Sequence, residues 1–323
     1  MITLYDTACG SENIGDEIIM DAVIYQLNIM FPAEIKVRFP THYPLSLDAK
    51  KLAWDNRLAF VGGTNLLRNY WRNRARKNQW AVPMIDAWKM MPAVLMGVGW
   101  NTYALTPKLY AKIFYNRALS KDWLHSVRDS YTVEKLKQCG ITNVINTGCP
   151  TLWGLSQDLL SSIPNKKSSK VVFTITDYRR DESKDLLLFN YLLNNYEEVY
   201  FWPQGSGDLD YFRTLSSGRP DKAERVSILG MDLQSFNNTL LRQDIDYIGT
   251  RLHAGVRALQ HKQRAMIISV DNRAEEMGKD FNLPVIARDQ IASSLDRLAD
   301  FNFSDIRLPN ENIANWKRQF LEK

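Results

Sequence analysis

The chain has 323 residues, of which 45% are hydrophobic and 24% are charged, and its formal net charge is +5. This composition is typical of a soluble globular protein of about two domains and argues against long disordered stretches. The mild basic excess is compatible with an anionic substrate, a membrane surface or nucleic acid, but most such proteins simply have a slightly basic surface.

The first half of the chain alternates short apolar runs with longer amphipathic segments. We predict strands at 1–6, 57–63, 92–100, the start of 123–140 and 143–150. We predict helices at 16–31 and over the rest of 123–140, where Gly140 ends the helix.

A segment rich in Ser, Lys and Pro, 156–170, is the best candidate for a linker. After it the alternation begins again, with strands predicted at 170–177, 197–205, 244–252, 264–271 and 282–289. The helices predicted in this half are 183–196, 209–215, 253–261, 275–281 and 311–323. Alternating strands and helices indicate parallel sheets, so we predict two α/β, Rossmann-like domains that face a cleft. Their bounds are 1–160 and 161–323, and the last helix is free to pack back on the first domain.

The cysteines, the start of the chain and its apolar runs bear on location. Three cysteines without a CxxC pair argue against a disulfide framework and a zinc site. The first residues lack the basic segment of a signal peptide. The longest apolar runs, such as MMPAVLMGVGW, are well below the ~20 residues of a transmembrane helix. We expect a cytoplasmic protein, at most attached to the inner face of the membrane.

Ligands of parallel α/β sheets bind beyond the carboxyl ends of the strands, so the residues that follow each strand are candidates. In SENIGDE, Asp16 lies at the start of a helix, where it serves either as a base or as a simple cap. In VGGTNLLR, Gly63 either offers its backbone N–H to a ligand or makes a tight turn. In GVGWNTY, Trp100 and Asn101 form either a sugar platform or part of the packed interior.

The most specific candidates are cations at predicted strand ends. Arg128, in SVRDSYTVEKL, holds either an anionic ligand or a local ion pair with Asp129 or Glu134. In GTRLHAGVRALQH, Arg251 and His253 lie at the start of a helix, whose free N–H groups attract anions. His253 adds a proton near neutral pH, although a lone histidine is more often structural. Arg273 is either a third cation of the same site or a solvated residue at the start of a helix.

The stretch RNYWRNRARKNQW, 68–80, mixes cations with aromatic residues. It is suited to an acidic or lipid-linked polymer or to nucleic acid, or it is an ordinary solvated helix or loop. Neither a GxGxxG nor a P-loop motif is present, and we find neither metal-ligand spacing nor a nucleophile elbow.

Taken in order, these motifs resemble the polysaccharide pyruvyl transferase family. The matching stretches are NIGDEII, VGGTNLL, VGVGWN, SVRDSYTVEKLKQCGI, NTGCPTLW, GTRLHAGVRALQH and ISVDNRAEEMGKDFNLPVI, and they span nearly the whole chain. The resemblance implies a two-domain fold similar to the glycosyltransferase B type. It also implies transfer of pyruvate from phosphoenolpyruvate onto two hydroxyls of a saccharide, giving a cyclic ketal and phosphate. Such a reaction serves the biosynthesis of a capsule, exopolysaccharide or cell-wall polymer.

The resemblance also implies roles for single residues. Arg128, Arg251 and His253, with Leu252 in the same turn, would bind the donor and carry the chemistry. The chain departs from the family at Cys149, where Asp is usual, and at Arg273, where Lys is usual. The first departure removes a possible acid or structural hydrogen bond, and the second keeps the positive charge but changes its shape. The donor assignment is compatible with both departures, whereas a catalytic acid at position 149 is not.

The donor carries about three negative charges, which Arg128, Arg251 and Arg273 could neutralise. We expect His253 to be the acid that protonates the methylene carbon and Asp16 to be the base. The acceptor is expected on the first domain, near three residues: Gly63, Trp100 and Asn101. We expect no metal, no cofactor besides the co-substrate phosphoenolpyruvate, and no nucleic acid. The saccharide could be free, nucleotide-linked or lipid-linked.

Two other functions fit the same sequence. One is a nucleotide-sugar glycosyltransferase of the same fold, although no acidic residue is obviously placed to hold a ribose. The other is a non-catalytic protein that binds polysaccharide or nucleic acid through 68–80, and the departure at Cys149 keeps this alternative open.

Overall fold

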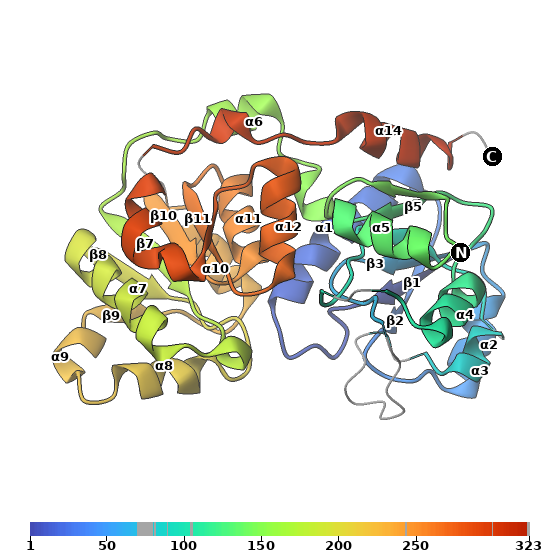
Figure 1. Cartoon of the computed structure of the whole chain (residues 1–323), viewed down its shortest axis with the longest axis horizontal. Helices are drawn as coiled ribbons and strands as arrows, with labels where there is room; N and C mark the ends of the chain where they lie inside the picture. The colour runs from blue at the N-terminus through green and yellow to red at the C-terminus, as the bar shows by residue number, and fades with distance from the viewer. Residues whose placement is uncertain are drawn as a thin grey trace. The chain divides into compact units, whose positions relative to one another are not determined.

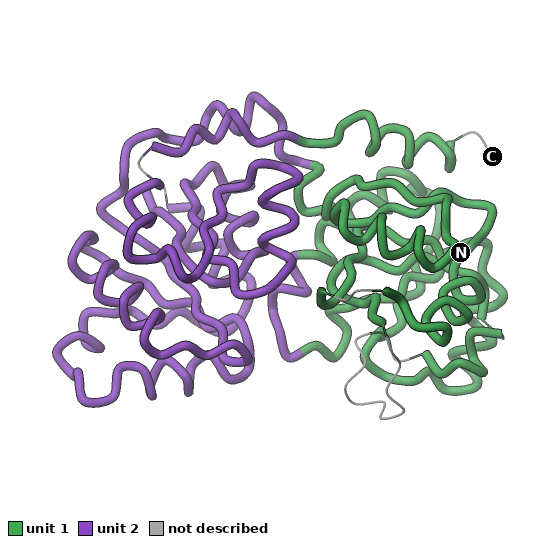
Figure 2. The backbone as a smooth tube through the Cα atoms, viewed as in Figure 1, with its two compact units in different colours: residues 1–11, 19–153, 308–323 green, residues 12–18, 154–307 purple. Residues whose placement is uncertain are grey.

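A computed structural model describes residues 1–69, 80, 82–88, 90–103, 106–242, 244–298 and 300–321 of the chain. The chain forms two compact units, which Figure 2 distinguishes by colour. Unit 1 comprises 1–11, 19–153 and 308–323, and unit 2 comprises 12–18 and 154–307. The main division therefore falls after residue 153 rather than after residue 160, and a short segment of each half belongs to the other unit.

Unit 1 is built on a parallel sheet of four strands in the order β2-β1-β3-β4 (Figure 1). The strands are β1 (Ile2–Asp6), β2 (Lys36–Pro40), β3 (Leu58–Gly62) and β4 (Val94–Met96). A second parallel pair consists of β5 (His125–Val127) and β6 (Val144–Asn146). A backbone bridge between Val98 and Val127 connects this pair to the chain that follows β4.

Helices surround this framework. They are α1 (Gly15–Met30), which begins in unit 2, then α2 (Leu47–Trp54), α3 (Met84–Ala87), α4 (Leu109–Ala118), α5 (Ser130–Gln138) and α14 (Asn310–Arg318). β1 and β3 are buried along their whole length because each has a neighbouring strand on both sides.

The last helix, α14, packs on unit 1. The ring of Trp316 lies 6.3 Å from that of Phe60 on β3, and Phe320 lies 5.3 Å from Phe60. Trp316 is fully buried. Burying side chains of this size stabilises the fold by about 1.5–3 kcal/mol each. This packing explains why the end of the chain belongs to the first unit.

Unit 2 contains a parallel sheet of six strands in the order β12-β11-β10-β7-β8-β9. The strands are β7 (Lys170–Thr174), β8 (Glu198–Phe201), β9 (Val226–Ile228), β10 (Ile245–Gly249), β11 (Ala265–Ser269) and β12 (Val285–Ala287). The helices are α6 (Gln157–Ser161), α7 (Glu182–Asn195), α8 (Asp208–Ser216), α9 (Pro220–Ala223), α10 (Leu233–Leu240), α11 (Leu252–Gln260), α12 (Asn272–Phe281) and α13 (Ile291–Ser294).

The order of strands in unit 2 reverses at its centre. β7 and β10 pair in the middle of the sheet, with β8 and β9 on one side and β11 and β12 on the other. The chain therefore leaves the two central strands in opposite directions, and a crevice opens beyond their carboxyl ends. This is the position at which a doubly wound sheet binds its ligand.

The sheets confirm the prediction of α/β units with parallel strands. Sequence analysis missed two strands, β2 and β9, and both are edge strands. Only one residue of each is buried, since one long side of an edge strand lacks a neighbour. Their sequences, KVRFP and VSI, therefore lack the continuous apolar run of a central strand.

Candidate functional site

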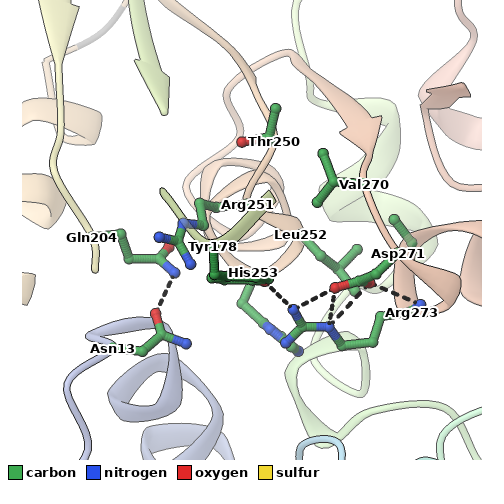
Figure 3. Close-up of a pocket in the computed structure, with 11 residues that line it drawn as sticks. Asn13, Tyr178, Gln204, Thr250, Arg251, Leu252, His253, Val270, Asp271 and Arg273 are labelled. Carbon is green, nitrogen blue, oxygen red and sulfur yellow. Dashed lines mark hydrogen bonds and ion pairs between the residues drawn. The ribbon is translucent and has the colours of Figure 1, made fainter. Parts of the chain in front are cut away.

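A small pocket lies at the carboxyl ends of β7, β8, β10 and β11, at the reversal of unit 2 (Figure 3). Its lining residues all belong to unit 2: Asn13, Tyr178, Gln204, Thr250, Arg251, Leu252, His253, Val270, Asp271, Arg273 and Ala274. The cavity itself measures about 10 Å³, which is room for about one water molecule. A larger ligand must therefore displace some of the lining.

Arg251 is held at the centre of this pocket by the packing of β7 on β10. A Cβ atom on Gly249 would come within 2.4 Å of Thr174, so only glycine lets the two strands end this close together. The backbone N–H of Arg251 then donates to Oγ1 of Thr174 at 3.3 Å. Arg251 is the residue that precedes the first turn of α11, and no side chain caps this helix. The guanidinium and the positive end of the helix dipole thus lie together.

Two carboxylates already hold the guanidinium of Arg251. Its Nη2 lies 3.2 Å from Oδ1 of Asp177 and also donates to Oδ1 of Asp208. Both acids follow neighbouring strands of the sheet: Asp177 comes after β7, and Asp208 is the first residue of α8, which follows β8. A Cβ atom on Gly205 would lie 2.5 Å from Nη2, so this glycine admits the guanidinium.

The two carboxylates differ in how firmly they are held. Asp208 is fully buried and accepts hydrogen bonds from the backbone N–H groups of Gln204, Gly205 and Asp177. Burial raises the pKa of Asp208, although Arg251 and these N–H groups oppose the shift. The side chain of Asp177 is 26% exposed. Asp208 is thus a fixed anchor, whereas Asp177 can leave Arg251 at a much smaller cost.

Arg273 is the second cation of the pocket. Its Nε and Nη2 contact both carboxylate oxygens of Asp271 at 2.6–3.1 Å, in a bidentate pair. Burial lowers the pKa of Arg273, but the charge of Asp271 outweighs it, so the pKa lies above its ordinary value. Asp16 acts in the same direction, which places its charge near this guanidinium.

Tyr178 connects the two arginines. Its ring centroid lies 5.1 Å from Cζ of Arg251, in a cation–π contact, and its hydroxyl accepts a hydrogen bond of 2.5 Å from Nη2 of Arg273. Half of the tyrosine is exposed to solvent. The short 3-10 turn at Asp177–Arg179 therefore contacts both cations at once, through Asp177 and Tyr178.

His253, Leu252 and Asp16 complete the predicted residues of unit 2. Leu252 and His253 are the first two residues of α11, and both line the pocket. Asp16 lies in the first turn of α1, as the sequence predicted, and is 6% exposed. This first turn stays with unit 2 because Gln204 binds Asn13 through a side-chain hydrogen bond of 2.7 Å, seen in Figure 3. The structure thus brings Arg251, His253 and Arg273 together.

Arg128 lies in unit 1 and is fully buried. Its Nε donates to Oδ2 of Asp129 at 2.9 Å and its Nη1 to Oδ1 of Asn65 at 2.6 Å. A Cβ atom on Gly99 would come within 2.1 Å of its Cζ, so the guanidinium is covered by the backbone there. The local ion pair, one of the two readings of the sequence, is therefore present. Nη2 has no hydrogen-bond partner among the described residues.

Two of the predicted acceptor residues need correction. The ring of Trp100 is fully buried and packs on Tyr115 at 5.7 Å, so it offers no face to a sugar. The N–H of Gly63 already donates to the carbonyl oxygen of Met96 at 2.9 Å. With φ of +49° and Ile19 in contact, Gly63 makes the tight turn that was its alternative reading. Asn101 is only partly buried and therefore remains a candidate for contact with the acceptor.

Cys149, the departure from the resembled family, is fully buried in unit 1. Burial raises the pKa of its thiol, so it does not replace the acid usual in the family. Within the part of the chain that the structure describes, no group of three side chains could hold a metal ion. None of the helices described there is long and apolar enough to cross a membrane. The basic stretch 68–80 lies almost wholly outside the described residues.

Sequence analysis missed the acids and the tyrosine of the pocket, Asp177, Asp208, Asp271 and Tyr178. Asp177 and Asp271 are the last residues of the predicted strands 170–177 and 264–271. Both acids therefore meet the criterion that points to Arg251, a position at the carboxyl end of a predicted strand. Asp208 gave no such signal, because it begins a helix and lies beyond the end of the predicted strand 197–205.

The sequence matches the model of one protein family. The model of that family, described as "Polysaccharide pyruvyl transferase", matches residues 13–272. No curated protein matches the chain. Among solved structures, the wall teichoic acid polymerase TagF matches with a TM-score of 0.42 and 9% identity, over 100% of this chain and 88% of that one. The heptosyltransferase WaaC of E. coli matches with a TM-score of 0.40 and 14% identity, over 99% and 98% of the two chains.

Proposed function

The chain belongs to the polysaccharide pyruvyl transferase family, and from this premise we propose that it transfers pyruvate from phosphoenolpyruvate to two hydroxyls of a saccharide. The product is a cyclic ketal, formed in the biosynthesis of a capsule, exopolysaccharide or cell-wall polymer. One observation carries the proposal: Arg251, His253 and Arg273 meet in one pocket, at the start of α11 and at the reversal of the sheet. That position suits a small anion with two acidic groups.

Donor binding is proposed to occur by exchange of anions. The donor carries a carboxylate and a phosphate, and the cavity of about 10 Å³ is too small for either group as it stands. Asp177, the exposed partner of Arg251, is the group that a donor anion replaces, while Asp208 keeps the guanidinium in place. The N–H groups at the start of α11 face the same anion. Arg273, as a bidentate donor, binds the second acidic group when it releases Asp271.

His253 and Asp16 are proposed to move the protons. His253, protonated, gives a proton to the methylene carbon of the donor, which makes the neighbouring carbon an oxocarbenium-like electrophile. One saccharide hydroxyl attacks this carbon and loses its proton to Asp16. The bond from carbon to the phosphate oxygen then breaks, and the second hydroxyl closes the ring. One hydroxyl proton restores His253 through Asp16 or solvent, and the other leaves on the phosphate, so that protons balance.

The pocket supplies the charge that this sequence of steps needs. The leaving phosphate gains charge as its bond to carbon breaks, and Arg251 and the α11 N–H groups stabilise that charge. In a pocket this enclosed, such donors act more strongly than in water. The acceptor is proposed to lie near Asn101, whereas Trp100 and Gly63 have other roles in unit 1. The part of Arg128 in donor binding stays a prediction.

The direct test is turnover. The protein would be mixed with phosphoenolpyruvate and a panel of free, nucleotide-linked and lipid-linked saccharides, and phosphate release would be followed. We expect phosphate to appear only with a suitable acceptor, whose mass rises by that of pyruvate less water. Transfer of a sugar from a nucleotide-linked member of the panel, without use of phosphoenolpyruvate, would instead identify a glycosyltransferase.

A further inference from the structure

Three short helices of unit 1 present large apolar side chains to solvent. Leu47 on α2 is 76% exposed, Ile85 on α3 is 67% exposed, and Leu109 on α4 is 73% exposed. Trp54, Trp88 and Ile113 on or beside the same helices are also exposed. Single exposed apolar residues are common, but a group of this size on adjacent helices indicates an interaction site.

The helices α2, α3 and α4 lie next to one another in Figure 1, and contacts between their side chains join them. An ion pair of 2.8 Å between Lys50 and Asp86 joins α2 to α3. Arg117 of α4 lies over the ring of Trp88, which ends α3, at 5.8 Å. We call this surface the α2–α4 face and define it by Leu47, Trp54, Ile85, Trp88, Leu109 and Ile113.

The face has amphipathic character at the level of a single helix. On α4, Leu109, Ile113 and Arg117 recur every four residues and are all exposed. The opposite side of the same helix, with Ala111 and Phe114, is buried in the core. The side of α4 that is exposed to water therefore combines two apolar side chains with a cation.

Charges around the face favour an anionic partner. Lys51 on α2, Lys112 and Arg117 on α4, and Lys108, which immediately precedes α4, are cations that are at least partly exposed. Lys50 is neutralised by Asp86. The exposed acids of these helices are Asp48 and Asp55, so four cations stand against two anions. Tryptophans beside lysines suit the headgroup region, where an aromatic ring meets the acyl chains and a cation meets the phosphate.

From these observations we propose that the α2–α4 face binds the surface of an anionic lipid bilayer. The apolar side chains enter the boundary between headgroups and acyl chains, and the lysines and arginine contact lipid phosphates. Binding of this kind attaches the protein to the membrane peripherally. The inference stands apart from the proposed reaction, since it rests on exposed residues of unit 1 and needs neither donor nor acceptor.

The test is sedimentation of the full chain with vesicles. Vesicles of phosphatidylglycerol and phosphatidylcholine in equal parts are compared with vesicles of phosphatidylcholine alone, at low and high salt. We expect binding to the anionic vesicles, weakened by salt because the charges are screened. The double variant L109E/I113E should bind at least about tenfold more weakly, since it loses two inserted side chains and adds two repelled charges.

The chain offers a matched control. Tyr25 and Ile29 on α1 have the same spacing of four residues and are 64% and 57% exposed, but exposed neighbours on that helix are Asp21 and Asn28 rather than lysines. The variant Y25E/I29E should bind vesicles as the wild type does. An equal loss of vesicle binding in both variants would overturn the proposal. So would a wild-type protein that does not bind anionic vesicles. The proposal would also fail if L109E/I113E changed only the oligomeric state of the protein and not its binding to vesicles. It would fail as well if the wild type bound nucleic acid but not lipid.

Discussion

Replacing Asp177 by Asn should make the pocket bind its donor more tightly. Asp177 occupies an anion position at Arg251, with Oδ1 of the acid 3.2 Å from Nη2 of the arginine. An incoming phosphate or carboxylate must break this pair before it can take its place. Asparagine keeps the size of the side chain but removes its charge, so the donor no longer competes with a carboxylate.

The size of the effect follows from burial. Arg251 is almost fully buried, but the side chain of Asp177 is 26% exposed, so water screens part of the attraction. Exposed ion pairs contribute about 0.2–1 kcal/mol, and a partly buried pair lies at or above the top of that range. Loss of about 1 kcal/mol of competing attraction corresponds to a dissociation constant about fivefold lower.

The assay is calorimetric titration of phosphoenolpyruvate into wild type and Asp177→Asn at two salt concentrations. Asp208→Asn is the contrasting variant, because it removes the buried anchor and should lower the free energy of unfolding by about 3 kcal/mol or more. Asp177→Asn should leave thermal unfolding nearly unchanged. Weaker donor binding in a well-folded Asp177→Asn would refute the reasoning, since Asp177 would then help to bind the donor rather than compete with it.

Three further predictions concern His253, Arg128 and His125. His253→Ala should lower turnover by about 10²–10⁴-fold in the phosphate-release assay while circular dichroism stays close to wild type, and an unchanged rate would remove His253 from the chemistry. Arg128→Lys should lower the free energy of unfolding of unit 1, measured by urea denaturation, by about 3 kcal/mol. Lysine cannot hydrogen-bond to Asn65 and Asp129 at the same time, as the guanidinium of Arg128 does, and an unaltered urea midpoint would contradict this role. Burial lowers the pKa of His125 to about 4, well below its unfolded value of about 6.5, because the folded protein disfavours the charged ring. The stability of the fold with neutral His125 is therefore complete above a pH of about 6.5 and is lost as the pH falls towards about 4. Between these values wild type should lose about 3 kcal/mol that His125→Asn does not lose, and parallel unfolding curves of the two proteins against pH would contradict the assignment.

The fold of the central strands could be predicted from the sequence because they are buried on every side. β1, β3, β10 and β11 are buried along their whole length and read as apolar runs. Edge strands and the division between the units could not be predicted in this way. Residues 12–18 join unit 2 through hydrogen bonds such as that from Ile14 to Gln204, which link positions far apart in sequence.

The candidate site shows the same contrast. Arg251 and His253 could be found because a strand followed by a helix fixes where their backbone lies. The ion pairs of Arg251 could not be found, since Asp177 and Asp208 come from other strands and meet it only in the folded sheet. Trp100 was misplaced because an aromatic residue after a strand has the same local sequence whether it faces solvent or the core.

The assignment of the donor to the Arg251 pocket can be tested by calorimetric titration of phosphoenolpyruvate into wild type and Arg251→Ala, with inorganic phosphate and a nucleotide-sugar as comparison ligands. We expect micromolar to millimolar binding of phosphoenolpyruvate to wild type and none to Arg251→Ala, in a variant that still unfolds cooperatively. Equal binding to both proteins would contradict the assignment of the donor to this pocket. Binding of the nucleotide-sugar alone would contradict the proposed donor itself.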